Sequence, residues 1–174
     1  MDLLRDGGAP LGDVYAFVSS LYFRGKRAYA ETFARPPEGT SGVLVITPSL
    51  GLVPLDHPVS LEGLGRMARV PIDPLEPRYR RPLAESALRL AEALGPSGEA
   101  VLLGSLATDK YLGPLGEVLG DRLRIPEAFV GRGDMSRGGL MLRAADAREE
   151  LTYRVLSSPR RLRLRRARRR PARR

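Results

Sequence analysis

Residues 42–54, which read Gly-Val-Leu-Val-Ile-Thr-Pro-Ser-Leu-Gly-Leu-Val-Pro, decide the fold class that the sequence predicts. Their first half, 43–47, is a short apolar run rich in β-branched side chains. This pattern is typical of a central parallel strand that is covered on both faces. The run Ala-Val-Leu-Leu-Gly at 100–104 has the same character. We therefore expect these two strands to be parallel and to lie next to each other, or one strand apart, at the centre of one sheet.

A strong helical pattern separates these two strands. Between Pro82 and Leu94 apolar residues recur every three or four positions, and the following Gly-Pro pair stops the helix. The other elements that the sequence predicts are a helix at 13–34, a short helix at 61–67 capped by Ser60, a helix at 111–119, a strand at 122–125 and a β-hairpin of 139–143 and 151–155. Strands that alternate with helices predict an α/β fold of three layers, with a mainly parallel central sheet and a C-terminal β-hairpin.

Positive charge is concentrated at the end of the chain. The 174 residues carry a net charge of +9, and ten arginines with no acidic residue lie between Arg160 and Arg174. The remaining 19 basic and 20 acidic residues leave the rest of the chain at −1. We expect a single α/β domain at 1–156 and a disordered arginine-rich tail at 157–174. The tail is a tether to nucleic acid, a contact for an acidic partner or membrane surface, or a segment without function.

The composition excludes several classes of site. The chain has no cysteine and a single histidine, His57, which excludes disulfides, thiolate chemistry and a zinc site built on several imidazoles. We predict no metal and no cofactor. No apolar stretch is long enough to span a membrane, and the acidic N-terminus does not resemble a signal peptide, so we expect a cytoplasmic protein. The oligomeric state is left open.

Three loops carry the polar groups from which a site would be built. In an open parallel sheet, ligands bind beyond the carboxyl ends of the strands. The first loop follows the strand at 43–47, and its candidate residues are Thr47, Ser49, Gly51, Asp56 and His57. These residues either contact a ligand or form an ordinary surface turn.

The second loop follows the strand at 100–104. Its candidate residues are Gly104, Ser105, Thr108, Asp109 and Lys110. Glycine permits a ligand to approach the backbone, and free amides at the start of the next helix favour anions. Alternatively, Thr108 or Asp109 only caps the helix at 111–119.

The third loop, 131–139, contains four glycines and two arginines. Its candidate residues are Arg132, Gly133, Asp134 and Arg137. Arginine recognises phosphate or carboxylate in a bidentate manner. We expect all three loops to converge on one cleft. By contrast, we interpret the cluster Tyr22, Arg24, Lys26 and Arg27 as the solvated face of a helix.

Short motifs along residues 15–135 carry a family resemblance. They are Leu-Tyr-Phe-Arg at 21–24, Arg-Ala-Tyr-Ala at 27–30, Ser-Leu-Gly-Leu-Val-Pro at 49–54, Lys-Tyr at 110–111 and Pro-Leu at 114–115, followed by Pro126, Gly131 and Gly133. The chain resembles small bacterial proteins grouped with the peroxide-stress YaaA-like proteins. It is more distantly similar to a domain of archaeal tRNA-modifying enzymes of the archaeosine pathway. The resemblance implies a three-layer α/β fold and an association with nucleotides or nucleic acid.

Three functional hypotheses follow. The first is a nucleotide- or nucleic-acid-associated protein that acts on a base or a glycosidic bond, with Asp56, Asp109 or Asp134 as the acid–base group and the two arginines of the third loop holding phosphate. The second is a non-catalytic module that the tail attaches to nucleic acid. The third is a stress-linked accessory protein that other proteins recognise. The sequence leaves open whether the protein is an enzyme.

Overall fold

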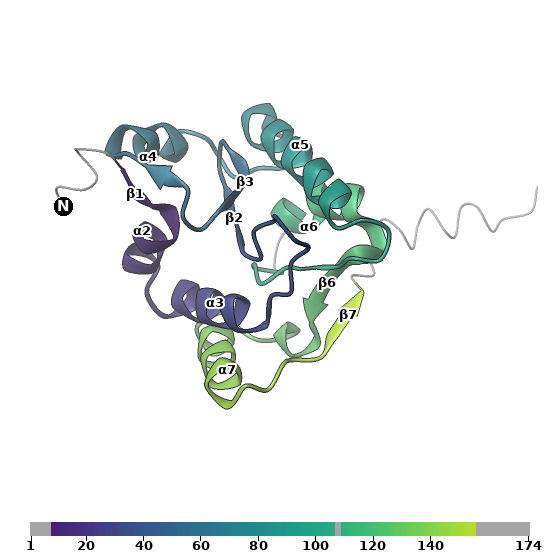
Figure 1. Ribbon diagram of the computed structural model, residues 1–174. Coiled ribbons are helices and arrows are strands. Elements are labelled where there is room, and N and C mark those ends of the chain that lie inside the picture. Colours follow the sequence, from purple (N-terminus) through teal and green to yellow (C-terminus); the bar gives the residue numbers. More distant parts are fainter. Residues whose placement is uncertain (1–7, 107–108, 156–174) are drawn as a thin grey trace, which may run out of the picture.

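The computed structural model describes residues 8–106 and 109–155, and they form six α-helices and three small sheets (Figure 1). The helices are α2 (Leu11–Val18), α3 (Ser20–Phe33), α4 (Leu61–Ala68), α5 (Pro77–Ala93), α6 (Asp109–Leu119) and α7 (Asp134–Ala147). The strands are β1 (Ala9–Pro10), β2 (Leu44–Thr47), β3 (Gly51–Pro54), β4 (Pro58–Val59), β5 (Ala100–Val101), β6 (Leu123–Pro126) and β7 (Tyr153–Val155). Two short 3-10 helices, η1 (Gly120–Arg122) and η2 (Glu127–Phe129), flank β6. The predicted tail, 157–174, lies outside the described residues.

The predicted α/β class is confirmed, but the predicted central parallel sheet is wrong. Strand β2 pairs antiparallel with β3, and Val45 faces Val53. Strand β5 belongs to another sheet, in which it runs parallel to β6, while β7 pairs antiparallel with β6. The third sheet consists of β1 and β4. The runs at 43–47 and 100–104 are therefore not neighbours in one sheet.

The turn between β2 and β3 explains the first difference. The hydroxyl of Thr47 donates to the carbonyl oxygen of Gly51 at 2.9 Å and accepts a hydrogen bond from the backbone N–H of Leu50. Gly51 has a φ of +70°, which a residue without Cβ adopts at little cost. This turn joins two apolar runs that are adjacent in sequence, and so the nearest pairing partner of β2 is β3.

The predicted hairpin at 139–143 is also wrong, because these residues belong to α7. Its buried residues Arg137, Gly138, Met141 and Ala144 recur at helical spacing, which the short apolar run at 140–142 concealed. Strand β7 pairs with β6 instead. The predicted helix at 13–34 is divided at Ser19 into α2 and α3, whereas the short helix capped by Ser60 is confirmed, with Gly63 N–H donating to the cap hydroxyl.

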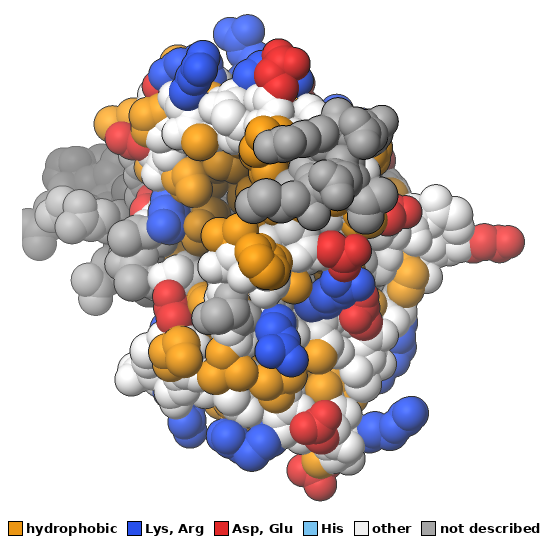
Figure 2. Space-filling view, turned by 90° about the vertical axis from the view of Figure 1, so that its left-hand side faces the viewer, with side chains coloured by type: hydrophobic (Ala, Val, Ile, Leu, Met, Phe, Trp, Pro, Cys, Tyr) orange, Lys and Arg blue, Asp and Glu red, His pale blue; other side chains and the backbone are white. Residues whose placement is uncertain are grey.

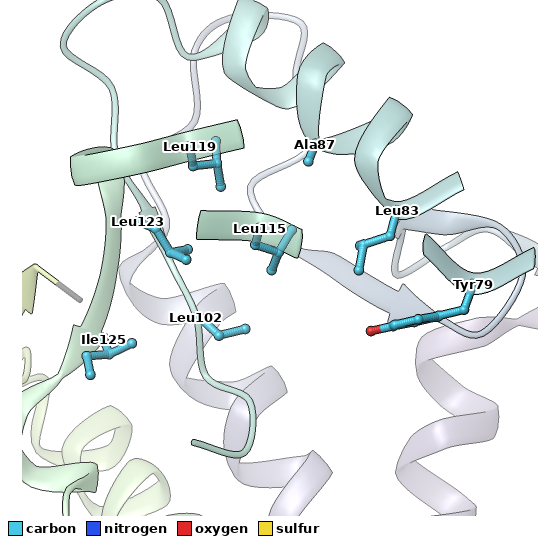
Figure 3. Close-up of a cluster of buried hydrophobic side chains, with 8 residues drawn as sticks. All are labelled: Tyr79, Leu83, Ala87, Leu102, Leu115, Leu119, Leu123 and Ile125. Atoms are coloured by element: carbon cyan, nitrogen blue, oxygen red, sulfur yellow. The ribbon is translucent and has the colours of Figure 1, made fainter. Parts of the chain in front are cut away.

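The largest core cluster joins α5, α6 and β6 (Figure 3). Tyr79, Leu83 and Ala87 project from α5 toward Leu115 and Leu119 of α6. The remaining members of this cluster are Leu102, Leu123 and Ile125. The predicted helix at 82–94 is confirmed and begins earlier, at Pro77, because the side chain of Glu76 accepts the N–H of Arg78 and caps it.

A second apolar cluster holds α3 against α7 and includes Tyr29, Phe129 and Met141. The two helices approach closely at Gly25 and Gly138. A Cβ atom at Gly25 would lie 2.5 Å from the carbonyl oxygen of Gly138. This contact fixes the rotation of α3 about its own axis and so decides which of its side chains point inward.

Candidate functional site

A cavity of about 880 Å³ lies between α3, the β2–β3 hairpin and the segment that follows β5. Its wall is largely apolar, and Tyr15, Phe23, Lys26 and Tyr111 contribute to one part of it. The rings of Tyr15 and Phe23 meet edge to face, with centroids 5.5 Å apart. A cavity of this size with a few polar groups is of the kind that holds small ligands in proteins.

Lys26 and Arg27 are the charged side chains of α3 that line this cavity, and only Arg27 is ion-paired among the described residues. The Nζ atom of Lys26 lies 3.8 Å from the centroid of the Tyr22 ring, one helical turn earlier. Among the residues that the structure describes, no carboxylate lies within ion-pair distance of this ammonium group. Burial lowers the pKa of Lys26 from 10.5 to about 8; Asp134 opposes the shift, and Arg137 and Lys110 add to it.

The interpretation of 22–27 as a solvated face is therefore wrong for Lys26. Arg24 is exposed, as expected. The guanidinium of Arg27 pairs with Asp13 at 2.6 Å and with Glu31 at 3.0 Å. Sequence reasoning missed Lys26 because it treated 22–27 as one face, although helical spacing places Lys26 on the side of Tyr22 and Tyr29 and Arg24 on the opposite side.

The second predicted loop reaches the same place. The hydroxyl of Tyr22 donates to the carbonyl oxygen of Leu103 at 3.3 Å, and Gly104 lines the cavity. Tyr79 donates to the carbonyl oxygen of Lys110 at 2.9 Å and so holds the first turn of α6. The Nζ atom of Lys110 lies 5.0 Å from the Tyr111 ring centroid. Ser105 is half-buried and Asp109 is exposed in the first turn of α6, while Thr108 lies outside the described residues.

The third predicted loop is partly the start of α7. Gly133 is its N-cap residue and Asp134 stands in its first turn. Arg137 is buried; it donates twice to the carbonyl oxygen of Phe129, at 3.0 and 3.2 Å, and to Asp134 at 3.3 Å. These bonds close the turn before α7. Arg132 is exposed, and its nearest described partner is Ser136 at 3.4 Å.

Part of the first predicted loop serves the fold. Thr47 is buried inside the hairpin turn, beside the half-buried Ser49, and Gly51 packs against α5. The backbone carbonyl oxygen of His57 accepts a hydrogen bond from Leu11 N–H at 2.9 Å, and Asp56 is exposed beside it. The cavity wall receives Leu52 and Leu55 from this loop. Lys110 of the second segment and Asp134 and Arg137 of the third thus act on the charge of Lys26, whereas the polar candidates of the first are not part of the cavity wall.

A chain of hydroxyls closes another part of the cavity wall. The backbone N–H of Leu151 donates to Tyr29 Oη at 2.8 Å, the hydroxyls of Tyr29 and Tyr153 are 2.6 Å apart, and Tyr153 donates to Glu150 at 3.0 Å. Burial raises the pKa of both tyrosines. Sequence reasoning also missed this group, which joins residues more than 120 positions apart.

Comparison with known proteins adds no relative. No protein-family model matches the chain, and neither curated proteins nor solved structures give a match. The resemblance to YaaA-like proteins stays a prediction.

The groups around Lys26 include hydrogen-bond donors and one carboxylate. Burial raises the pKa of Tyr15 and of Tyr22, so both phenols are protonated donors at neutral pH. Among the three predicted acid–base residues, Asp134 is the one whose charge acts on Lys26. The described residues contain no group of three or more side chains placed to hold a metal ion. The site therefore offers an amine, phenols and one carboxylate.

Proposed function

We propose that the protein binds a nucleotide, or a small ligand of the same build, with its flat ring in the cavity and its anionic group near Lys110. The observation that carries this proposal is an aromatic cavity wall that contains Lys26, with Lys110 beside the wall residue Tyr111. Aromatic side chains bind flat rings by stacking or edge contacts. Tyr15, Phe23 and Tyr111 are available for that purpose.

The anionic group is assigned to the start of α6. Lys110 stands in the first turn of this eleven-residue helix, where backbone amides add to its attraction for anions. The positive charge of Lys110 helps to lower the pKa of Lys26, so the two ammonium groups are near enough to repel each other. Arg137 is a weaker candidate because its guanidinium is buried and bonded to the turn before α7.

A small ligand fits the described surface better than a long nucleic acid does. Residues 8–106 and 109–155 contain 18 basic and 18 acidic side chains. On the face shown in Figure 2, positive and negative side chains are mixed among hydrophobic ones outside the grey atoms. Nucleic-acid binding normally requires a surface with an excess of positive charge. If the protein acts on a base or a glycosidic bond, Asp134 is the carboxylate we assign to proton transfer.

Native mass spectrometry and calorimetry test this proposal. Freshly purified protein should retain a ligand, and a titration with adenosine monophosphate should give saturable heat. Lys110→Met should weaken the monophosphate about tenfold, the usual size of one charged hydrogen bond, and should leave adenosine binding unchanged. Arg89→Met, which removes an exposed cation from α5, is the matched control. A protein that retains no ligand and shows no saturable heat with any of the nucleoside monophosphates would contradict the proposal.

A further inference from the structure

We propose that Lys26 is a nucleophilic amine that captures the aldehyde or ketone group of a ligand in the cavity. The inference rests on the proposed ligand cavity and narrows its ligand to a carbonyl compound. A lysine on a protein surface is normally solvated or ion-paired, and neither state describes Lys26. The chain contains one other lysine, Lys110, so the two can be compared within one molecule.

The position of Lys26 suits attack on a bound ligand. Its side chain lines the cavity together with Tyr15 and Tyr111, and its Nζ is held 3.8 Å from the Tyr22 ring centroid. The tight crossing of α3 and α7 at Gly25, the preceding residue, fixes the backbone from which it projects. A nucleophile that is held in place beside its ligand reacts faster than a free amine because less freedom is lost on the way to the transition state.

The charges around Lys26 favour the neutral amine. Tyr22 faces it from α3, Lys110 and Tyr111 from α6, and Asp134 and Arg137 from α7. The one carboxylate among them is bonded to Arg137 at 3.3 Å, which reduces its hold on a second cation. The pKa of about 8 leaves about a tenth of Lys26 neutral at pH 7, whereas an ordinary lysine is neutral in well under a thousandth of molecules. Desolvated lysines beside other cations are activated in this way.

The reaction balances without an oxidant or reductant. The lone pair of Nζ forms a bond to the carbonyl carbon while the carbon–oxygen π bond breaks, and a proton moves from nitrogen to oxygen to give a carbinolamine. Loss of the hydroxyl and of the remaining N–H proton as one water molecule leaves a C=N bond. The protonated phenol of Tyr15, which lines the same cavity, is able to donate a hydrogen bond to the departing oxygen, whereas the hydroxyl of Tyr22 already donates to Leu103.

Trapping with pyridoxal tests the inference. Pyridoxal bears an aldehyde and a ring but no phosphate, and cyanoborohydride reduces an imine to a stable adduct that peptide mass spectrometry locates. At pH 7.5 the full-length protein should be modified at Lys26 at least about tenfold more than at Lys110, as expected for an activated amine. The initial rate at Lys26 should rise with pH and reach half its maximum near pH 8. Equal modification of the two lysines, or preference for Lys110, would overturn the inference.

Two variants separate reactivity from a merely structural role. Lys26→Arg keeps a cation over the Tyr22 ring but has no nucleophilic amine, so the adduct should disappear while the thermal unfolding midpoint stays close to that of the wild type. Adding Arg24→Lys to this variant places an exposed lysine on the same helix. That lysine should react no faster than Lys110, and a rate equal to that of the native Lys26 would overturn the inference. Binding of adenosine monophosphate is measured separately, so loss of trapping with retained binding rejects the amine chemistry alone.

Discussion

At the residue scale, the desolvated charge of Lys26 lowers the free energy of unfolding at neutral pH. Its pKa falls from 10.5 in the unfolded chain to about 8 in the fold, so between these values the unfolded state binds more protons. The free energy of unfolding that Lys26 contributes therefore rises with pH over this window, and the penalty is fully present below pH 8. A charged amine in a cavity wall is tolerated where a ligand makes use of it.

Lys26→Met should stabilise the protein at neutral pH. Removing the desolvated charge should raise the free energy of unfolding by about 1–2 kcal/mol at pH 7, after allowance for partial exposure and for the lost contact with Tyr22. The gain should shrink as pH approaches 10.5. Urea unfolding of the variant and the wild type at pH 7 and pH 10 measures this difference. A variant less stable than the wild type at pH 7 would show that the charge is not penalised.

Gly51 and Gly95 allow the cost of a strained backbone to be measured apart from the cost of steric overlap. Both have positive φ, +70° and +63°, but a Cβ at Gly51 would overlap Pro82 and Ser86 of α5, while nothing lies within 4 Å at Gly95. Gly95→Ala should cost about 1–2 kcal/mol for the left-handed conformation alone. Gly51→Ala should cost about 2–3 kcal/mol more, because the hairpin must move away from α5. Urea unfolding of both variants tests this, and equal costs would mean that the hairpin adjusts freely.

At the element scale, the pairing of α3 with α7 positions the site. The two helices meet at Gly25 and Gly138, and their backbones come close because glycine has no side chain to hold them apart. This crossing brings Tyr22 and Lys26 toward the residues that follow β5 and toward the start of α7. A change at the crossing should therefore affect both stability and the reactivity of Lys26.

Gly25→Ala should destabilise the protein by about 1–3 kcal/mol, because backbone atoms of Gly138 cannot yield as a flexible side chain would. Gly65→Ala is the matched control, since Gly65 is exposed in α4 with nothing within 4 Å of a new Cβ. This control should gain about 0.5–1 kcal/mol from its higher helix propensity. Thermal and urea unfolding compare the two. A stabilised Gly25→Ala would contradict the close crossing of α3 and α7.

At the scale of the whole molecule, charge is divided between the described residues, which are balanced, and the arginines from Arg160 to Arg174. Long-range attraction to nucleic acid therefore belongs to that segment. The full-length protein should bind DNA or RNA without sequence preference. The logarithm of its binding constant should fall with the logarithm of salt concentration at about −0.7 to −0.9 per phosphate neutralised.

Truncation after Ser158 should remove this salt-dependent binding and leave the binding of adenosine monophosphate unchanged. Fluorescence anisotropy at several salt concentrations measures the first effect, and calorimetry measures the second. A truncated protein that binds nucleic acid as tightly, with the same salt dependence, would show that the described surface carries the interaction instead.

The local pattern of the sequence determined most of the elements. Apolar spacing and end signals predicted helices at 61–67, 82–94 and 111–119, and short runs predicted strands at 43–47 and 122–125; the structure has a helix or strand at each of these places. These features depend on interactions within a few residues of each other. The same information was insufficient at 139–143, where a short apolar run fits a strand as well as part of a helix.

Only the tertiary structure decided which elements meet and which side chains they enclose. Apolar strands at 43–47 and 100–104 fit a parallel sheet equally well, but the tight turn at Gly51 gave β2 a closer partner. Helical spacing places Arg24 and Lys26 on opposite sides of α3 but does not say which side is enclosed; in the structure Arg24 is exposed and Lys26 lines the cavity. The reason is that the rotation of α3 is set by its contact with α7, more than a hundred residues away, and a helical pattern contains no information about that distant surface.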